Sequence, residues 1–321
     1  MCSLDIGKNI QKAKQLLEAG ELVAIPTETV YGLAANGLSA DAVLKIYKAK
    51  NRPSFNPLIL HVPYLGEAKK LAQYFPEKAL QLAETFWPGP LTLVLPKKDS
   101  VPDIVTAGQP TVAIRVPNHP LTLQLLRALD FPLAAPSANP SGFISPTSVI
   151  HVQQQLGEKI AYVLDGGECS VGVESTIVKV TENEVSILRY GGISVEDIID
   201  IIGEVNLPGE NNIRPEAPGM LTSHYAPTAP LIVANIELAI QQYSNKKIGV
   251  LSFQKKYETE NVIMNLVLSP HGNVDEAAKN IFAYLHQLDA QSLDIIITEF
   301  VPNEGLGKAV NDKLKRASAE R

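Results

Sequence analysis

Short apolar runs alternate with amphipathic stretches through residues 1–205 of the chain. Apolar residues spaced three and four apart predict helices, whereas short continuous apolar runs bounded by turn formers predict buried strands. The predicted strands cover 22–25, 58–62, 91–95, 111–116, 133–135, 160–164, 174–180 and 185–190. The predicted helices cover 6–19, 40–49, two stretches within 65–86, 119–129 and a stretch ending at Gly203. These elements predict an α/β fold whose sheet has mixed strand directions.

Turn formers refine this pattern. The segment PTETVYGLAAN (26–36) is rich in turn formers, and Trp87–Pro90 breaks the chain. The strands at 174–180 and 185–190 predict a hairpin over Glu182 and Asn183. Ser194 and Asp197 have the spacing of a capping box, which predicts that a helix begins there.

Residues 206–230 differ in character from what precedes them. This segment holds five prolines and several turn clusters, which is typical of an interdomain linker. Beyond it, strands and helices alternate: apolar runs at 230–235, 247–253, 262–269 and 294–300, and helices near 236–244, 274–288 and 307–319. Such alternation predicts a small, doubly wound, mostly parallel sheet. The chain is thus expected to divide into 1–205, a linker at 206–230 and a domain at 231–321.

Composition narrows the class of protein. The chain has 321 residues, 45% hydrophobic and 19% charged, as is typical of a globular protein. Its net charge of -6 disfavours non-specific nucleic-acid binding, which needs an excess of Lys and Arg. Two cysteines, Cys2 and Cys169, make a disulfide or a cysteine-based zinc site unexpected. With neither a signal-peptide pattern nor an apolar run of membrane-spanning length, we expect a cytoplasmic protein without membrane contact.

A basic cluster lies at the end of the helix predicted over 40–49. Lys45, Lys48, Lys50 and Arg52 fall within eight positions that contain no acidic residue. Lys50 and Arg52 alternate just after the helix, where a loop can direct both toward one anion, and their types suit triphosphate oxygens. The alternative is a solvated helix end, because cations near a helix C-terminus complement its dipole. Spacing alone leaves both interpretations open.

Small polar residues follow the strand predicted at 133–135, in the run PSANPSG (136–142). Ligands tend to bind beyond strand ends in α/β sheets, and Ser137, Asn139 and Ser141 are types that hydrogen-bond phosphate or ribose. An ordinary Pro/Ser/Asn turn explains the run equally well.

Two arginines lie within or at the end of apolar strands, Arg115 in TVAIRV and Arg189 in SILRYGG. Such an arginine is seldom buried without a partner, which is either a bound carboxylate or phosphate or a structural acid. His61 in LILHV, taken alone, is more often a core residue than a ligand. Ser175 in VESTIV either lines a pocket or hydrogen-bonds its own backbone, and Glu28 and Glu174 are either ordinary surface acids or metal-linked carboxylates.

Common nucleotide-binding motifs are absent from the sequence. Residues 32–37 have the glycine spacing of a Walker A motif, but Leu38 and Ser39 stand where Lys and Ser/Thr would follow. There is also no GxGxxG, GxSxG, HExxH or paired CxxC. If this protein uses ATP, it binds the nucleotide outside the common nucleotide folds.

Taken together, these segments resemble the L-threonylcarbamoyladenylate synthases, whose catalytic part is a YrdC-like domain. The resemblance rests on PTETVYGL, the run around Lys50 and Arg52, PSAN, and the pair ESTIV and ILRYG, in family order and spacing. It covers about 1–205, the linker, where SHYAP (223–227) resembles a family motif, and the extra C-terminal domain of the long form. It implies a YrdC-like twisted mixed sheet followed by a Rossmann-like C-terminal domain.

The resemblance implies roles for individual residues. L-threonine would be held by Thr29, His61, Arg115, the backbone at Ala135, and Ser175. ATP would be held by Arg52, Asn56, Thr111, Ser137, Asn139, Ser145 and Arg189, with Tyr225 of the linker closing over the nucleotide. Arg115 would neutralise the threonine carboxylate, and Lys50 and Arg52 would be the catalytic pair facing the reacting phosphate. No side chain is assigned to a metal.

The implied chemistry joins threonine, bicarbonate or CO2, and ATP. The amine forms a carbamate, whose oxygen attacks the α-phosphorus of ATP and expels diphosphate, with Mg2+ on the triphosphate side. The product, threonylcarbamoyl-AMP, would pass to a transferase complex that modifies adenosine 37 of tRNA to N6-threonylcarbamoyladenosine (t6A). A lid would keep water from the intermediates, and the linker with Tyr225 would serve as that lid or as a passive tether.

Two other functions compete with this one. Related domains occur in hydrogenase-maturation carbamoyltransferases, but those carry cysteine-paired zinc motifs that two isolated cysteines do not supply. A non-catalytic module that docks structured RNA or tRNA is the second alternative: the cluster at 45–52 permits it, and the net charge opposes strong affinity. A weak tRNA contact is compatible with the enzyme as well.

Overall fold

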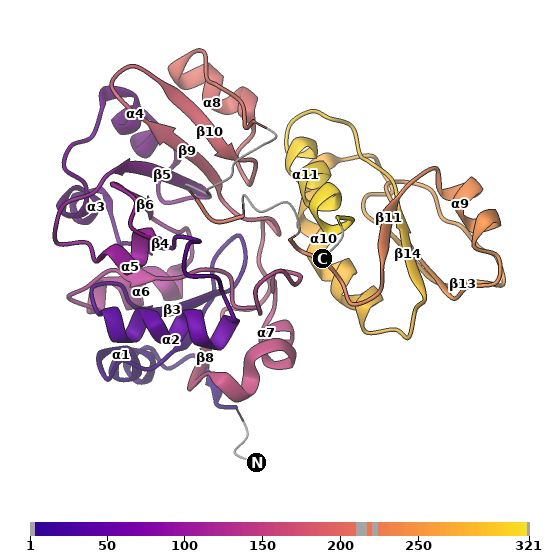
Figure 1. Ribbon diagram of the computed structural model, residues 1–321, viewed down its shortest axis with the longest axis horizontal. Coiled ribbons are helices and arrows are strands. Elements are labelled where there is room, and N and C mark those ends of the chain that lie inside the picture. The colour runs from indigo at the N-terminus through magenta and orange to yellow at the C-terminus, as the bar shows by residue number, and fades with distance from the viewer. Residues whose placement is uncertain (1–3, 210–216, 220–223, 320–321) are drawn as a thin grey trace.

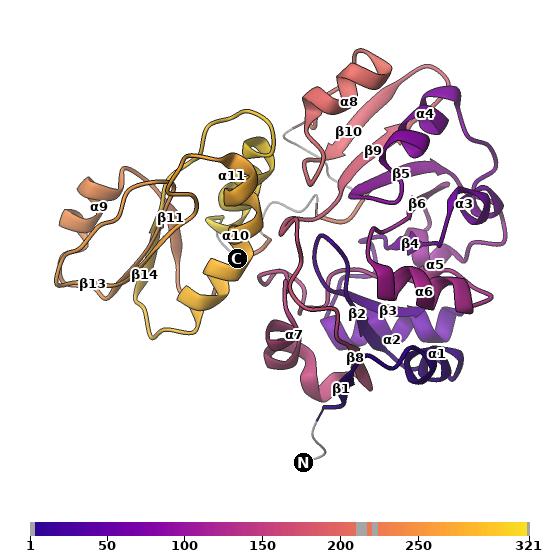
Figure 2. The same ribbon diagram turned by 180° about the vertical axis from the view of Figure 1, so that it is seen from behind.

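The computed structural model describes residues 4–209, 217–219 and 224–319 of the chain. Residues 210–216 and 220–223 of the predicted linker, including Ser223 of SHYAP, lie outside the described residues, as does Cys2. The described residues form two α/β bodies, each built on its own sheet, which lie side by side (Figure 1, Figure 2).

The larger body is built on a mixed ten-stranded sheet in the order β1-β8-β2-β3-β7-β4-β6-β5-β9-β10. The pairs β1/β8, β2/β8, β4/β6 and β5/β9 are parallel and the other neighbours antiparallel, as the mixed pattern predicted. The strands are β1 (Ile6–Gly7), β2 (Val23–Ile25), β3 (Gly32–Asn36), β4 (Ile59–His61), β5 (Leu91–Pro96), β6 (Thr111–Arg115), β7 (Leu133–Ala134), β8 (Tyr162–Leu164), β9 (Thr176–Val180) and β10 (Val185–Arg189).

Helices cover both faces of this sheet. They are α1 (Ile10–Glu18), α2 (Ala40–Lys50), α3 (Leu65–Leu71), α4 (Glu77–Phe86), α5 (Asp103–Thr106), α6 (Pro120–Ala128), α7 (Val149–Leu156) and α8 (Val195–Ile202). The alternation of side chains along β2 divides the core: Val23 and Ile25 pack with α1 and α6, whereas Ala24 joins the cluster that contains Val43 and Ile46 of α2.

The smaller body has four parallel strands in the order β11-β14-β12-β13, which confirms the predicted parallel C-terminal sheet. Its strands are β11 (Leu231–Val233), β12 (Ile248–Ser252), β13 (Val262–Val267) and β14 (Ile295–Thr298), and its helices are α9 (Ile236–Gln242), α10 (Val274–Asp289) and α11 (Gly307–Ala317). Helices α10 and α11 face the larger body, and α9 packs on the other side of the sheet (Figure 1).

One apolar cluster crosses the boundary between the two bodies. Phe282 and Leu285 of α10 share it with Val30, Val173 and Tyr225. A shared buried core fixes the two bodies against each other, because separating them would expose this apolar surface to water.

The structure corrects the expected start of the first helix. Asn9 caps α1 by accepting a hydrogen bond from the Lys12 amide at 3.0 Å, so the helix begins at Ile10 rather than at residue 6. Ile6 and Gly7 instead pair with β8. The hydroxyl of Tyr162 accepts from the Asn9 amide at 3.0 Å and would lie only 2.9 Å from a Cβ on Gly7, so tertiary contacts decide this segment.

Three further elements differ from the sequence pattern. The turn-rich segment 26–36 contains strand β3, stabilised by pairing with β2 and β7 on either side. Two short helices, α5 and α7, were not predicted, because neither has a long apolar period. The hairpin of β9 and β10 and the Ser194 cap of α8 are confirmed.

Among the described residues, no helix combines the length and the hydropathy that a membrane-spanning helix needs.

Candidate active site

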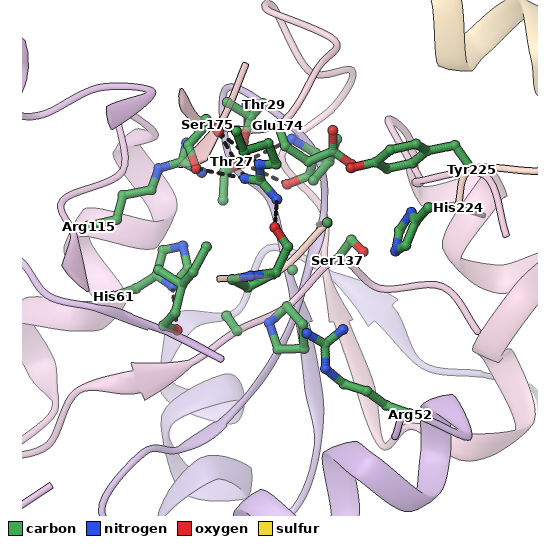
Figure 3. A pocket seen from close by; sticks show the side chains of 18 residues that line it. Thr27, Thr29, Arg52, His61, Arg115, Ser137, Glu174, Ser175, His224 and Tyr225 are labelled. Atoms are coloured by element: carbon green, nitrogen blue, oxygen red, sulfur yellow. Dashed lines mark hydrogen bonds between the residues drawn. The ribbon is translucent and has the colours of Figure 1, made fainter. Parts of the chain in front are cut away.

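A pocket lies where the loops after β2 and β7 and the segment before β9 meet residues from the linker (Figure 3). Nine of the residues that the resemblance singles out line it: Thr29, Arg52, His61, Arg115, Ala135, Ser137, Ser175, Arg189 and Tyr225. These residues come from positions 29 to 225 of the chain, so only the fold brings them together.

Strand register places the residues at one end of this pocket. His61 and Arg115 are direct partners on the parallel strands β4 and β6. Nη2 of Arg115 donates to Oε1 of Glu28 at 2.6 Å, and the other oxygen of Glu28 accepts from the Asn118 amide at 3.0 Å. Both members of the ion pair are buried, so Glu28 is the structural acid that this strand arginine needs.

Two threonine hydroxyls line the next part of the pocket. Oγ1 of Thr27 lies 2.6 Å from the Val30 carbonyl and 2.8 Å from Oγ1 of Thr29. The single proton of Thr27 is used on the carbonyl, so Thr29 donates to Thr27. The free lone pairs of the Thr29 oxygen are then available to a donor such as an ammonium group.

The geometry at the end of α2 decides which side chains of the basic cluster are buried. Asn51 adopts the left-handed conformation, with φ of 50°, and turns the chain so that Arg52 points back into the protein. Nε and Nη2 of Arg52 donate to the carbonyls of Asn56 and Pro57 at 3.1 and 2.8 Å. Lys50 is buried and donates to the carbonyls of Ser137 and Asn139. Lys45 instead pairs with Glu21 near the surface.

Arg189 is held by the segment that precedes β9. Nε and Nη2 donate to the Ser175 carbonyl at 3.1 and 2.9 Å, and Nη2 also reaches the Ser175 hydroxyl at 3.1 Å. Nη1 donates to the carbonyl of Pro218 at 3.1 Å, so a linker residue occupies one donor of this arginine.

Residues from the predicted linker form the remaining wall. Tyr225 is fully buried, and its hydroxyl has no hydrogen-bond partner among the described residues. A Cβ on Gly219 would lie 2.9 Å from both Cδ of Arg189 and the hydroxyl of Tyr225, so only glycine fits there. The cavity measures about 40 Å³ and is partly open to solvent, whereas a cavity of about 150 Å³ holds one benzene molecule. A nucleotide is larger than benzene, so the walls must move apart before this pocket can hold one.

The environment of the pocket sets the charge of its side chains. Burial, aided by Arg115, lowers the pKa of His61 to about 3, so the imidazole is neutral at pH 7. Burial also lowers the pKa of Lys50, with a smaller contribution from Arg52, and brings that of Arg52 to about 10. The pKa of Tyr225 is raised by burial and then by Glu174, which keeps its hydroxyl protonated as a donor.

Five of the singled-out residues do not line the pocket. Asn56 is buried beside Arg52 with both side-chain polar atoms unpartnered among the described residues, which leaves them available to a ligand. Lys50 supports the PSAN loop by donating to its backbone carbonyls, and the side-chain amide of Asn139 donates to the carbonyls of Pro140 and Phe143. Ser145 donates to Glu174 at 2.7 Å. Thr111 begins β6 and pairs with Pro96, at the opposite end of the strand from Arg115.

Several lining residues were missed or left undecided by the sequence. Glu174 lines the pocket, and only 6% of its surface is exposed to solvent. Its Oε2 atom has no hydrogen bond among the described residues. His224 belongs to SHYAP but was given no role, although it lies beside Tyr225 in Figure 3. Thr27 also lines the pocket, and the only sign of this in the sequence is that it lies in the PTETVYGL motif, two positions before Thr29. Pro218 and Gly219 also line the pocket, but in the sequence they are recognisable only as turn formers.

Comparison with known families covers almost the whole chain. The family described as "Telomere recombination" matches residues 15–191, and the family described as "Threonylcarbamoyl-AMP synthase, C-terminal domain" matches residues 193–319. The two matches meet near the end of β10, so the second includes α8 and the predicted linker as well as the smaller body.

Individual relatives give the same picture. A protein of Pyrococcus abyssi (strain GE5 / Orsay) named threonylcarbamoyl-AMP synthase is 42% identical, over 97% of this chain and 94% of its own. A protein of Bacillus subtilis (strain 168) with the same name is also 42% identical, over 97% and 93%. The crystal structure of P. abyssi Sua5 complexed with L-threonine superposes with a TM-score of 0.92 at 41% identity, covering 98% of this chain and 97% of that one.

Proposed function

The chain belongs to the threonylcarbamoyl-AMP synthase family, and on that premise we propose that it condenses L-threonine, bicarbonate or CO2, and ATP into L-threonylcarbamoyl-AMP, releasing diphosphate. It is a nucleotidyltransferase that makes the activated intermediate for t6A modification of tRNA. The observation that carries the proposal is one pocket that joins Arg115 and Thr29 to Arg52 and Arg189.

The pocket has one end suited to an amino acid and one suited to phosphates. We assign threonine to the end formed by Thr29, His61 and Arg115, where the neutral imidazole and the Glu28-paired arginine leave little net charge for a zwitterion. We assign the triphosphate to the end formed by Arg52 and Arg189, with Lys50 behind the PSAN loop. Guanidinium groups suit phosphate oxygens because they donate two hydrogen bonds in parallel.

The reaction itself needs positioning and charge neutralisation. The threonine amine, once it has lost a proton, adds to CO2 to form a carbamate. A carbamate oxygen then bonds to the α-phosphorus, and the bond from that phosphorus to the bridging oxygen breaks, so diphosphate leaves with the electron pair. Holding both reactants in one dry pocket contributes roughly 7–11 kcal/mol to such a step when the geometry is good. Arg52, Arg189 and Lys50 would stabilise the charge on the departing diphosphate.

A magnesium ion would travel with the nucleotide. The described residues contain no group of three or more side chains able to hold a metal. Mg2+ is commonly bound through one or two carboxylates and substrate phosphates, and Glu174 offers one carboxylate oxygen without a hydrogen bond in the described pocket. Bound there, it would supply charge neutralisation on the triphosphate.

Substrate entry requires the linker to move. Pro218 occupies a donor of Arg189, and Tyr225 and Gly219 close the cavity. We propose that nucleotide binding displaces the Pro218 carbonyl from Arg189 and that Tyr225 then contacts the nucleotide through its free hydroxyl. The product would pass to a tRNA-modifying transferase in the cytoplasm, where ATP and tRNA are present.

Diphosphate release by the purified protein tests this function. L-threonine and bicarbonate are each supplied or omitted in degassed buffer with ATP and Mg2+. We expect release only when both are present, and a loss of at least tenfold in Arg52→Ala and Lys50→Ala. Lys45→Ala is the matched control, because Lys45 lies on the same helix but pairs with Glu21 outside the pocket. No release in any combination, together with salt-sensitive tRNA binding, would favour the RNA-binding module instead.

A further inference from the structure

The tyrosine that closes the pocket is held from behind by the smaller body. The ring of Tyr225 lies 5.3 Å from the ring of Phe282 on α10, and Nζ of Lys313 on α11 lies 5.3 Å from the centre of the same ring. The backbone of Tyr225 is left-handed, with φ of 64°, which an ordinary residue adopts only when its surroundings compensate. The surroundings that hold Tyr225 therefore include the smaller, C-terminal body, while its hydroxyl lines the pocket of the larger, catalytic body.

Lys313 is a side chain of the smaller body that reaches the catalytic body. It is fully buried, and its ammonium donates to the backbone carbonyl of Tyr190 at 2.8 Å. It lies 3.8 Å from Oε2 of Glu174 and 3.3 Å from Asp312. One cation thus contacts the segment after β10, the carboxylate that lines the pocket and the aromatic ring of the linker.

Burying an ammonium group is costly unless several partners compensate it. An interface that only held the two bodies together would be served by a partly exposed pair such as Lys308 and Glu196, which also joins α11 to α8. Lys308 is 22% exposed at its side chain, and its ion pair is with Glu196, which does not line the pocket. Lys308 and Lys313 of α11 therefore differ in what they touch rather than in which bodies they join.

We propose that Lys313 is a positioning residue of the nucleotide site, through which the C-terminal body sets the placement of Glu174 and Tyr225 and hence the binding of ATP. This inference rests on the proposed function and deepens it. Lys313 touches no substrate; it acts by fixing one carboxylate and one ring that border the triphosphate end. Thr29, His61 and Arg115 have no hydrogen bond or ion pair with Lys313 among the described residues, so we expect threonine binding to depend on it much less than ATP binding does.

Steady-state kinetics of Lys313→Met test the proposal. Methionine keeps an unbranched apolar stem only one atom shorter than lysine and removes the charge. We expect KM for ATP to rise about tenfold, equivalent to about 1.4 kcal/mol, while KM for L-threonine changes by less than twofold. Lys308→Met is the matched control: it removes a cation of the same helix from the same interface, and both KM values should stay within twofold of the unmodified chain.

The outcomes separate the proposal from its alternatives. An unchanged KM for ATP in Lys313→Met, or an equal rise in both KM values with a lower unfolding temperature, overturns it, because a purely structural lysine would give that result. If Lys313→Met does not fold, Lys313→Gln, which keeps a donor for the Tyr190 carbonyl, takes its place under the same criteria. Absence of threonine- and bicarbonate-dependent diphosphate release in the unmodified chain would refute the proposed function instead, and is recognised before any variant is made.

Discussion

Buried charge distinguishes the candidate site at the scale of single residues. Five buried cations, Lys50, Arg52, Arg115, Arg189 and Lys313, and two buried carboxylates, Glu28 and Glu174, lie in or beside the pocket in the described part of the chain. The cations outnumber the carboxylates, and buried charges are stable only when they are compensated. The excess is concentrated where we assign the triphosphate, whose negative charge would complete the compensation.

The Glu28–Arg115 pair gives the first prediction. Glu28→Gln keeps the size of the side chain but leaves Arg115 buried without its counter-charge, and breaking a buried pair in this way costs about 3–5 kcal/mol. We expect urea denaturation to report a loss of that size. Glu67→Gln is the control, because Glu67 pairs with an exposed Lys70 and such surface pairs contribute about 1 kcal/mol or less. Equal, small losses in both variants would show that Glu28 is not the compensating charge.

Tyr225 gives a second prediction, in which stability and binding move in opposite directions. Its buried hydroxyl has no partner among the described residues, and an unpaired buried polar group costs about 1–3 kcal/mol. Tyr225→Phe is therefore expected to be as stable as the unmodified chain or more so. Calorimetry should nevertheless show ATP binding weakened by roughly fivefold to tenfold, the size of one lost hydrogen bond. Unchanged ATP affinity would show that the hydroxyl does not contact the nucleotide.

The sequence identifies a site residue only where residue type and spacing set it apart from similar residues elsewhere in the chain. The cluster at 45–52 presented four similar cations, and only burial separates Lys50 and Arg52 inside from Lys45 at the surface. Glu174 could not be ranked above other acids, because its unpaired oxygen and its proximity to Lys313 arise from packing between the two bodies. The role of Lys313 had no local signal: it lies in an amphipathic helix like any other lysine.

At the scale of elements, the errors follow from pairing between distant segments. Strand β3 was hidden in a turn-rich motif because its stability comes from β2 and β7 rather than from its own residues. Long apolar runs such as β5 and β6 and helices with a strong period such as α10 were predicted closely, since local pattern and tertiary packing agree there.

Two helices from different bodies meet through a pair of histidines. The rings of His151 on α7 and His286 on α10 stack with centroids 3.8 Å apart. Nε2 of His286 lies 3.2 Å from the Ser145 carbonyl and so donates to it, and Nδ1 of His151 accepts from the Thr147 amide at 3.3 Å. Burial and then His286 lower the pKa of His151 to about 3, and burial lowers that of His286 to about 4. Both rings are neutral at pH 7.

This contact predicts a loss of stability in mild acid. The pKa of each histidine is near 6.5 in the unfolded chain and lower in the folded one, so the unfolded state binds more protons between about pH 4 and 6.5. Stability contributed by the pair is present above pH 6.5 and is lost as the pH falls through that window. From pH 7 to 5 we expect about 1–2 kcal/mol for each histidine that stays neutral, after allowance for partial exposure.

Thermal unfolding at pH 7 and pH 5 measures this effect. His286→Gln should show a smaller drop between the two pH values than the unmodified chain, because one acid-sensitive group is gone. His271→Gln is the control: His271 is exposed and lies outside the pair, so its variant should behave like the unmodified chain. A drop in His286→Gln equal to that of the unmodified chain would mean that the acid sensitivity originates elsewhere.

At the scale of the whole molecule, the two bodies meet so closely that one position admits only glycine. Gly172, with φ of 81°, precedes β9, and a Cβ there would lie 2.3 Å from the carbonyl oxygen of Lys279 on α10. Two positions later in the chain comes Glu174, which Lys313 approaches at 3.8 Å. The same segment therefore carries both a close approach to the smaller body that leaves no room for a Cβ and a carboxylate of the pocket. Docking of the two bodies and the shape of the nucleotide site are geometrically linked.

Gly172→Ala tests that link, with Gly167→Ala as its matched control. Both glycines have nearly equal φ, 81° and 80°, so alanine is strained by a similar amount, about 1–2 kcal/mol, at each. Only at Gly172 does the added methyl group also meet the smaller body, since nothing lies within 4 Å of a Cβ at Gly167. We expect small-angle scattering to show a larger radius of gyration for Gly172→Ala alone. If docking positions Glu174 and Tyr225, its KM for ATP should rise about tenfold as in Lys313→Met, with KM for threonine little changed. Undocked bodies with unaltered ATP kinetics would show instead that the catalytic body forms its nucleotide site unaided.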